Sequence, residues 1–312
     1  MTMNKKLIFD KISEQLAENL YPGASVSLYQ VGDWQDSYFG LADPETGLAS
    51  QAGLVYDLAS VSKVVGVGTI FAFMAHKGEL ELDQTLKELY PTFDHEQVTL
   101  RQLLTHTSGL NPFIPNRDQL DQEQLKEALN HLQLKVDKSF HYTDVNFLLL
   151  GFLLEELYGQ SLNVLFEREI FQPWQMRETS FGPLAQAVPT VRGARAGLVH
   201  DPKARVLGVH AGSAGLFSTV ADLKKFLEHY LTDDFAQALT QNYSREAGKT
   251  RSLAWNLEGD WLDHTGYTGT FLMYNRKSQE AAIFLSNRTY ERDERAYWIE
   301  KRNELMNLIR KS

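Results

Sequence analysis

The sequence predicts an α/β fold in which the two ends of the chain build one sheet and the middle is a helical insertion. Two observations lead to this prediction. Strand-like apolar runs occur near the start and again near the end of the 312 residues, whereas the middle carries mostly helical spacing. We therefore expect a discontinuous α/β domain made of residues 1–78 and 191–312, and a helical domain made of residues 79–190.

The first part of the chain begins with a helix and continues with a hairpin. Apolar residues in Lys5–Leu20 recur near helical spacing. Ala24–Gly32 and Trp34–Leu41 alternate as strands do, and Val31-Gly32-Asp33 provides the turn between them. Small and apolar residues then predict a helix over Ser60–His76, which Lys77-Gly78 closes.

The later elements follow from the same patterns. Helical spacing predicts helices in the middle of the chain at Val98–Thr105, Leu120–Leu132, Thr143–Tyr158 and Leu162–Phe171. After residue 191, helices are predicted at Thr219–Leu231 and Arg292–Arg310, with short strands at Arg251–Asn256, Trp261–Thr265, Thr270–Arg276 and Glu280–Leu285. These strands would join the hairpin at the start of the chain in one sheet.

Composition excludes several classes of protein. The chain has no cysteine, so it holds neither a disulfide framework nor a thiolate metal site. Its nine histidines form no H-E-x-x-H motif, and no metal site or cofactor is expected. A net charge of −9 argues against nucleic acid as a partner. The longest apolar run, Val64–Ala75, is shorter than a membrane span, and no signal peptide is evident, so we expect a cytoplasmic protein that does not bind membranes.

Ser60-Val61-Ser62-Lys63 is the first candidate for chemistry. Ser60 would begin a helix, and Lys63 would lie one turn later on the same face. A serine hydroxyl becomes a good nucleophile when a neighbouring base takes its proton. Lysine can act as that base if burial and the positive end of a helix lower its pKa. The alternative is a helix-capping serine followed by a solvated lysine.

Two later motifs complete a set. Tyr142-Thr143-Asp144 precedes an apolar helix, where the tyrosine could shuttle protons to the Ser60–Lys63 pair. His264-Thr265-Gly266-Tyr267 is typical of a strand edge that a substrate approaches closely, and the amides of Ser60 and Tyr267 could hold an oxyanion. Taken singly, each motif could equally be an ordinary helix start or a glycine-containing hairpin.

In this order, the three motifs resemble those of the serine β-lactamase and penicillin-binding protein superfamily, in its class C β-lactamase and esterase branch. Further similar segments are His106-Thr107-Ser108-Gly109-Leu110, Ala214-Gly215-Leu216-Phe217-Ser218-Thr219 and Ser286-Asn287-Arg288. The resemblance therefore covers nearly the whole chain. It implies an antiparallel sheet with helices on both faces, an inserted helical domain and an active site between the two parts.

The resemblance also implies a mechanism. Ser60 would attack a carbonyl group, Lys63 and Tyr142 would handle the proton, and water would hydrolyse the acyl-enzyme. His264, Thr265, Gly266, Tyr267 and Asp144 would bind the substrate and its oxyanion. A competing nucleophile, Ser213 in the A-x-S-x-G segment 211–215, lacks the parallel βαβ pattern that α/β-hydrolases place around such a serine.

Three hypotheses for the substrate remain open. The protein hydrolyses esters or D-amino-acid amides, or it is a β-lactamase or D-Ala-D-Ala carboxypeptidase, or it is an idle penicillin-binding homologue. The second motif has Asp144 where the family usually has asparagine, and the third has His264 in place of lysine. Both changes make a pocket less positive and favour substrates without a carboxylate, unless an ion pair with Lys63 offsets Asp144.

Overall fold

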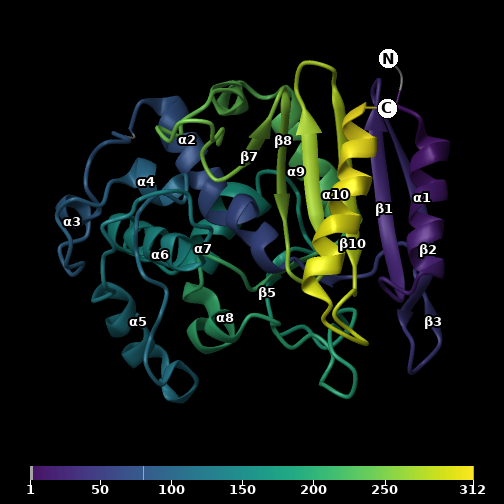
Figure 1. The fold of residues 1–312 in the computed structure, drawn as a ribbon, viewed down its shortest axis with the longest axis horizontal. Coiled ribbons are helices and arrows are strands. Elements are labelled where there is room, and N and C mark those ends of the chain that lie inside the picture. The colour runs from purple at the N-terminus through teal and green to yellow at the C-terminus, as the bar shows by residue number, and fades with distance from the viewer. Residues whose placement is uncertain (1–2, 80, 312) are drawn as a thin grey trace.

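The computed structural model describes residues 3–79 and 81–311. Its largest layer is a seven-stranded antiparallel sheet of order β3-β2-β1-β10-β9-β8-β7 (Figure 1). The strands are β1 (Gly23–Gln30), β2 (Asp33–Asp43), β3 (Leu48–Ala49), β7 (Asn256–Glu258), β8 (Trp261–Thr265), β9 (Phe271–Asn275) and β10 (Glu280–Ser286). Because β1 pairs with β10, segments from both ends of the chain lie side by side. The predicted antiparallel sheet is confirmed.

Helices cover both faces of this sheet, as expected. The helices α1 (Lys5–Ala17) and α10 (Arg295–Lys311) pack on one face, and α9 (Val220–Thr232) contacts β1, β9 and β10 on the other (Figure 1). Phe284 of β10 belongs to the α1–α10 core, whereas its neighbours Ile283 and Leu285 belong to the opposite core. Side chains that alternate along a strand therefore fill two separate cores.

The part of the chain between β3 and α9 is mostly helical. Its elements are, in order, β4 (Tyr56–Asp57), a 3₁₀ turn (Ala59–Val61), a π-helical turn (Val64–Gly68), α2 (Thr69–Lys77), α3 (Leu86–Leu89), α4 (Leu100–Leu104), α5 (Gln122–Asn130), α6 (Val145–Tyr158), α7 (Leu162–Phe166), β5 (Ser180–Phe181), α8 (Pro202–Leu207) and β6 (Leu216–Ser218). The strands β4, β6 and β5 form a second, small sheet that the sequence patterns did not predict. Its strand β4 directly precedes the turn that carries the candidate nucleophile.

One predicted strand is wrong. Arg251–Asn256 forms a tight turn, in which the Ser252 amide donates to the Trp255 carbonyl over 3.0 Å and Ala254 has a φ of +69°. A left-handed residue cannot continue an extended strand. The apolar run that suggested a strand is buried in the core, and the edge strand β7 begins only at Asn256.

The helix predicted from Ser60 changes type along its length. It runs from a 3₁₀ turn through a π-helical turn into α2. Taken together, Ala59–Lys77 is long and apolar enough to cross a membrane by length and composition, and 78% of its most apolar window is buried within the fold. Such burial is typical of a core helix.

Candidate functional site

The candidate nucleophile lies in a constrained turn. Ser60 is the middle residue of the 3₁₀ turn that follows β4, and Ala59 before it has a φ of +47°. This left-handed conformation is rare for a residue with a Cβ atom and often marks functional sites. The buried Asp57 carboxylate fixes the turn, because it accepts the Ala59 amide over 2.8 Å and the His200 amide over 2.7 Å.

Lys63 is fully buried beside Ser60. Its ammonium donates to Ser60 Oγ over 2.8 Å, to Asp144 Oδ1 over 2.7 Å and to the Ser213 carbonyl over 2.9 Å. An ammonium has three N–H donors, and all three are used here. The structure therefore brings together Ser60, Lys63 and Asp144, which come from two of the three motifs.

The condition under which Lys63 could act as the base, a lowered pKa, is not met. Burial alone would lower this pKa, but the Asp144 carboxylate outweighs burial and raises the Lys63 pKa above its ordinary value. The burial of Lys63 and, as the alternative, its ion pair with Asp144 are both expected from the sequence, and the structure shows both. Lys63 is therefore an ammonium at neutral pH and acts on Ser60 as a hydrogen-bond donor.

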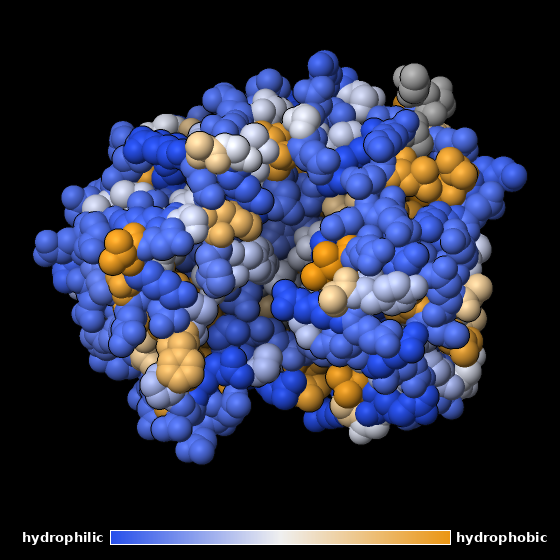
Figure 2. Space-filling view, in the orientation of Figure 1, coloured by the Kyte–Doolittle hydropathy of each residue, from blue (hydrophilic) through white to orange (hydrophobic). Residues whose placement is uncertain are grey.

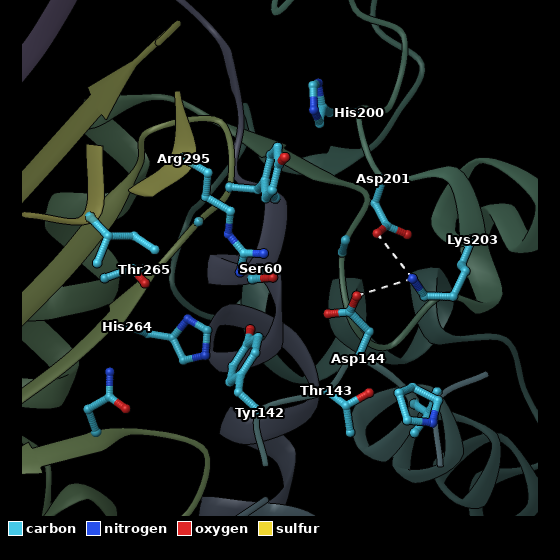
Figure 3. Close-up of a pocket in the computed structure, with 18 of the residues that line it drawn as sticks. Ser60, Tyr142, Thr143, Asp144, His200, Asp201, Lys203, His264, Thr265 and Arg295 are labelled. Atoms are coloured by element: carbon cyan, nitrogen blue, oxygen red, sulfur yellow. Dashed lines mark ion pairs between the residues drawn. The ribbon is translucent and has the colours of Figure 1, made fainter. Parts of the chain in front are cut away.

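Asp144 belongs to an alternating chain of charges. Lys203 Nζ lies 3.2 Å from Asp144 Oδ2 and 3.6 Å from Asp201 Oδ2, as the dashed lines in Figure 3 mark. Burial would raise the pKa of Asp144, but Lys63 and Lys203 together hold it below its ordinary value. The negative charge that Asp144 brings to the pocket is thus offset by two lysines.

Tyr142 lies over the same lysine. The Lys63 ammonium is 5.2 Å from the centroid of the Tyr142 ring, and this ring packs at a tilt of 41° against the buried imidazole of His106, with 4.5 Å between the ring centroids. His106 Nδ1 accepts the Thr143 amide and the Asn146 side-chain amide. His106 is therefore a structural residue that holds the second motif in place.

The third motif is tied to the nucleophile turn. Thr268 Oγ1 donates to the Asp57 carbonyl over 2.9 Å, and Thr270 Oγ1 donates to the Leu58 carbonyl over 3.0 Å. A Cβ atom on Gly266 would lie 2.6 Å from that same Leu58 carbonyl, so only glycine allows this close approach. The end of β8 is thereby held against the turn that carries Ser60.

His264 is buried beside Tyr142, with 6.1 Å between the two ring centroids. Burial keeps its pKa well below the ordinary value, so the imidazole is neutral. Neither ring nitrogen has a hydrogen-bond partner among the described residues. The His264 ring forms part of the pocket wall, and its nitrogens are buried there.

These residues surround one pocket of about 900 Å³. Figure 2 shows the surface hollowed between the helical half and the sheet half of the molecule, and Figure 3 shows the side chains around the pocket. The predicted site residues that line it are Ser60, Tyr142, Asp144, His264, Thr265, Gly266 and Tyr267. Lys63 lies behind them, and the competing Ser213 is fully buried. Within residues 3–79 and 81–311 no group of three metal-ligating side chains occurs.

The pocket also contains basic side chains that were not predicted from the sequence to lie there. Its lining includes the basic residues Arg117, Lys203, Lys249, Arg251, Arg288, Arg295 and Arg302, and the acidic residues Asp144 and Asp201. Asp201-Pro202 carries a recognisable helix-start signal, because Asp201 caps α8 and proline occupies its first turn. Arg288 belongs to the Ser286-Asn287-Arg288 segment already noted, whereas the other arginines carry no local signal, since loops and α10 bring them to the pocket from distant parts of the chain.

Comparisons with known proteins agree with this geometry. The family model described as Beta-lactamase matches residues 8–305. A relative from Escherichia coli (strain K12), named "Putative D-alanyl-D-alanine carboxypeptidase", is 25% identical and aligns over 81% of this chain and 73% of its own. A beta-lactamase/D-alanine carboxypeptidase from Pseudomonas syringae superposes with a TM-score of 0.80 at 19% identity, covering 98% of both chains. A penicillin-binding protein homologue from Pyrococcus abyssi, described as octameric, superposes with a TM-score of 0.74 at 20% identity, covering 98% of this chain and 78% of its own.

Proposed function

Because this chain belongs to the beta-lactamase family, we propose that it is a serine hydrolase that forms an acyl-enzyme on Ser60. The observation that carries the proposal is the 2.8 Å hydrogen bond from the buried Lys63 ammonium to Ser60 Oγ, at a pocket that Tyr142 also lines. A buried cation beside a serine hydroxyl stabilises the alkoxide that develops during attack. The pair is thus arranged for nucleophilic catalysis.

In the proposed reaction, Ser60 Oγ bonds to the substrate carbonyl carbon while the Tyr142 hydroxyl relays the proton: its oxygen accepts the serine proton as it passes its own proton to the leaving group. Lys63 is already protonated, so it stabilises charge on Ser60 and Tyr142 and takes no proton in this step. The backbone amides of Ser60 and Tyr267 are the proposed oxyanion donors, supported by the bonds that tie the end of β8 to the nucleophile turn. The leaving group departs with the relayed proton, and water then hydrolyses the acyl-enzyme.

The proposed substrates are small esters or D-amino-acid amides. A second candidate function is hydrolysis of β-lactams or of peptides that end in D-Ala-D-Ala, and one observation favours it. The basic residues of the pocket outnumber its acidic residues, and Asp144 is neutralised by Lys63 and Lys203. A cationic pocket attracts a substrate carboxylate. The charge of this pocket therefore supports the expected preference for substrates that lack a carboxylate less strongly than the sequence alone does.

Labelling and turnover separate these functions from that of an idle binding protein. An activated phosphonate should add one adduct, detected by intact mass and located on the Ser60 peptide. Ser60→Ala should abolish the adduct, whereas Ser213→Ala, which changes the competing serine, should retain it. Turnover of a chromogenic ester then distinguishes an enzyme from an idle homologue, and penicillin hydrolysis distinguishes the two substrate classes. An adduct that persists in Ser60→Ala would disprove the proposal.

A further inference from the structure

The Tyr267 amide, one of the two proposed oxyanion donors, lies in the tight turn between β8 and β9. Within this turn, the Gly266 amide donates to the Thr270 carbonyl over 2.7 Å, and the Gly269 amide donates to the Gly266 carbonyl over 3.2 Å. Among the described residues, no group accepts a hydrogen bond from the Tyr267 amide. This N–H is therefore free to donate to a substrate oxygen.

Arg288, in the loop that follows β10, contacts Tyr267 at two places. Its Nε donates to the Tyr267 carbonyl over 2.9 Å, and its guanidinium lies 4.8 Å from the centroid of the Tyr267 ring. The backbone amide of Arg288 also donates to the Thr268 carbonyl, over 3.2 Å. Arg288 is buried, so its side chain is confined to this position.

Asp293 connects the outer ends of these two side chains. Its Oδ1 accepts from Arg288 Nη1 over 2.6 Å, and its Oδ2 accepts from the Tyr267 hydroxyl. Burial would raise the pKa of Asp293, but the hydrogen bonds from Tyr267 and Arg288 hold it below its ordinary value. Arg288, Asp293 and Tyr267 therefore form a closed ring of contacts, which we call the Tyr267 clamp.

The Tyr267 clamp limits the directions in which the Tyr267 amide can point. The carbonyl and the side chain are two of the groups bonded to Tyr267 Cα, and the backbone angle at that atom stays near about 111°. Holding both groups therefore also fixes the direction of the Cα–N bond. An oxyanion donor is effective when it is held in advance, about 2.7–3.1 Å from the oxygen that becomes negative.

Two other side chains contact the Tyr267 ring but not its backbone. The His200 ring centroid and the Arg295 guanidinium each lie 5.4 Å from the centroid of this ring. Neither has a hydrogen bond to the Tyr267 carbonyl within the part of the chain that the structure describes. The backbone of Tyr267 is thus held by Arg288.

We propose that Arg288 is a positioning residue, which holds the Tyr267 amide in the geometry that stabilises the oxyanion. This inference rests on the proposed function, because it concerns the acylation of Ser60. Arg288 lines the pocket, but its Nε and Nη1 already donate within the protein. Its role is therefore to act through Tyr267, and no charge on the substrate is needed for it.

Two uncharged substrates test this role: an aryl ester and its thionoester, in which sulfur replaces the carbonyl oxygen. Because sulfur is a weak hydrogen-bond acceptor, a misplaced oxyanion donor slows the ester far more than the thionoester. In Arg288→Gln we expect kcat for the ester to fall about 10²-fold, the lower end of the usual loss for one oxyanion donor. The ester-to-thionoester ratio of kcat/KM should fall at least tenfold.

A nearby arginine provides a matched control. Arg192 lies outside the pocket and makes similar contacts, because it pairs with Glu291 and lies 5.6 Å from the centroid of the Tyr290 ring. Arg192→Gln should leave the ester-to-thionoester ratio unchanged. Asp293→Asn removes only the negative charge of the Tyr267 clamp, at an exposed side chain, and should lower the ratio by a smaller factor than Arg288→Gln.

Thermal denaturation shows which variants are folded, and Asp293→Asn decides the question if Arg288→Gln does not fold. A folded variant of either residue that slows the ester and the thionoester equally would overturn the inference, because a merely structural role affects both substrates alike. An unchanged ester rate in Arg288→Gln would also overturn it. Failure of the wild-type protein to form an adduct on Ser60 would instead overturn the proposed function.

Discussion

At the residue scale, the site depends on a lysine that is held protonated. Lys63 donates all three of its N–H groups, and one of its acceptors is the oxygen of the candidate nucleophile. The proton of Ser60 therefore needs another path, and the Tyr142 hydroxyl, whose ring lies over the lysine, is the proposed relay to the leaving group. Lys63 and Tyr142 should act as a unit.

Substituting either residue tests this unit. We expect Lys63→Ala or Tyr142→Phe to lower kcat by about 10²–10⁴, the usual contribution of general acid–base groups. Because cooperating groups are non-additive, the double variant should lose far less than the product of the single losses. Steady-state kinetics on a chromogenic ester would measure all three variants, and fully multiplicative losses would contradict a shared relay.

The charge of the pocket gives a second prediction. Asp144→Asn together with His264→Lys adds up to two positive charges beside Ser60, so penicillin acylation should rise several-fold relative to ester hydrolysis. The Asp144 change also leaves Lys63 and Lys203 without their shared carboxylate. Stopped-flow acylation of both substrates gives the ratio, and an unchanged ratio would show that these two positions do not select for charge.

At the element scale, Asp57 in the turn before Ser60 makes the stability of the protein depend on pH. Burial raises the pKa of Asp57 to about 6, while two backbone amides oppose the shift. Because the pKa of Asp57 is higher in the folded than in the unfolded protein, protonated Asp57 stabilises the fold. This stabilisation is complete below about pH 4 and is lost as the pH rises through 6. The turn that carries the nucleophile is thus less stable at neutral pH than at pH 4.

Chemical denaturation across pH measures this effect. From pH 4 to pH 7, Asp57 should contribute about 3 kcal/mol of lost stability, which Asp57→Asn should not show. The exposed Asp33→Asn serves as the control for removing a carboxylate, and should follow the wild-type curve. If the wild-type and Asp57→Asn curves ran parallel over this range, Asp57 would not titrate as expected.

The π-helical turn gives a prediction about packing. A Cβ atom on Gly66 would lie 2.4 Å from the buried ring of Phe166, so Gly66→Ala should destabilise the protein by about 1–3 kcal/mol. Phe166→Leu removes the obstructing ring edge, and in that background Gly66→Ala should cost less. Thermal denaturation of the double-mutant cycle tests the contact, and purely additive losses would rule it out.

At the scale of the whole molecule, the sheet unites the two ends of the chain. β1 lies between β2 and β10, and Lys11 of α1 pairs with Glu304 of α10 over 3.0 Å. These contacts support, as a proposal, one discontinuous domain from residues 1–78 and 191–312. Figure 1 shows the start of α1 and the end of α10 on the same side of the molecule.

A circular permutant tests this proposed unit. The two ends of this 312-residue chain are joined by a short Gly/Ser linker, and the chain is opened at Gly47, an exposed turn whose Cβ position meets no neighbour. The permutant should fold, keep its Ser60 adduct and unfold in one transition, because the sheet contacts are retained. An insoluble permutant, alongside a soluble chain that carries the same linker as an insertion at Gly47, would contradict the prediction.

The sequence by itself determined the elements with strong local patterns and the motifs that name the site. Trp261–Thr265 is a strand as predicted, and the predicted helix over Thr143–Tyr158 is present as α6. Both depend on the periodicity of nearby side chains, which a single sequence displays. The Ser60–Lys63 hydrogen bond follows from a spacing of three residues on one helical face.

Only the tertiary structure decided the charges of the site. Asp144 comes from the start of α6 and Lys203 from α8; the pairing of Asp144 with Lys63 raises the pKa of Lys63 against the effect of burial, and Lys203 is a second partner of the same carboxylate. Arg302 reaches the pocket on the last helix of the chain. A pKa and a pocket's charge depend on which groups lie within a few ångströms in a buried, low-dielectric space. Separation along the chain carries no record of those distances, so folding alone sets them.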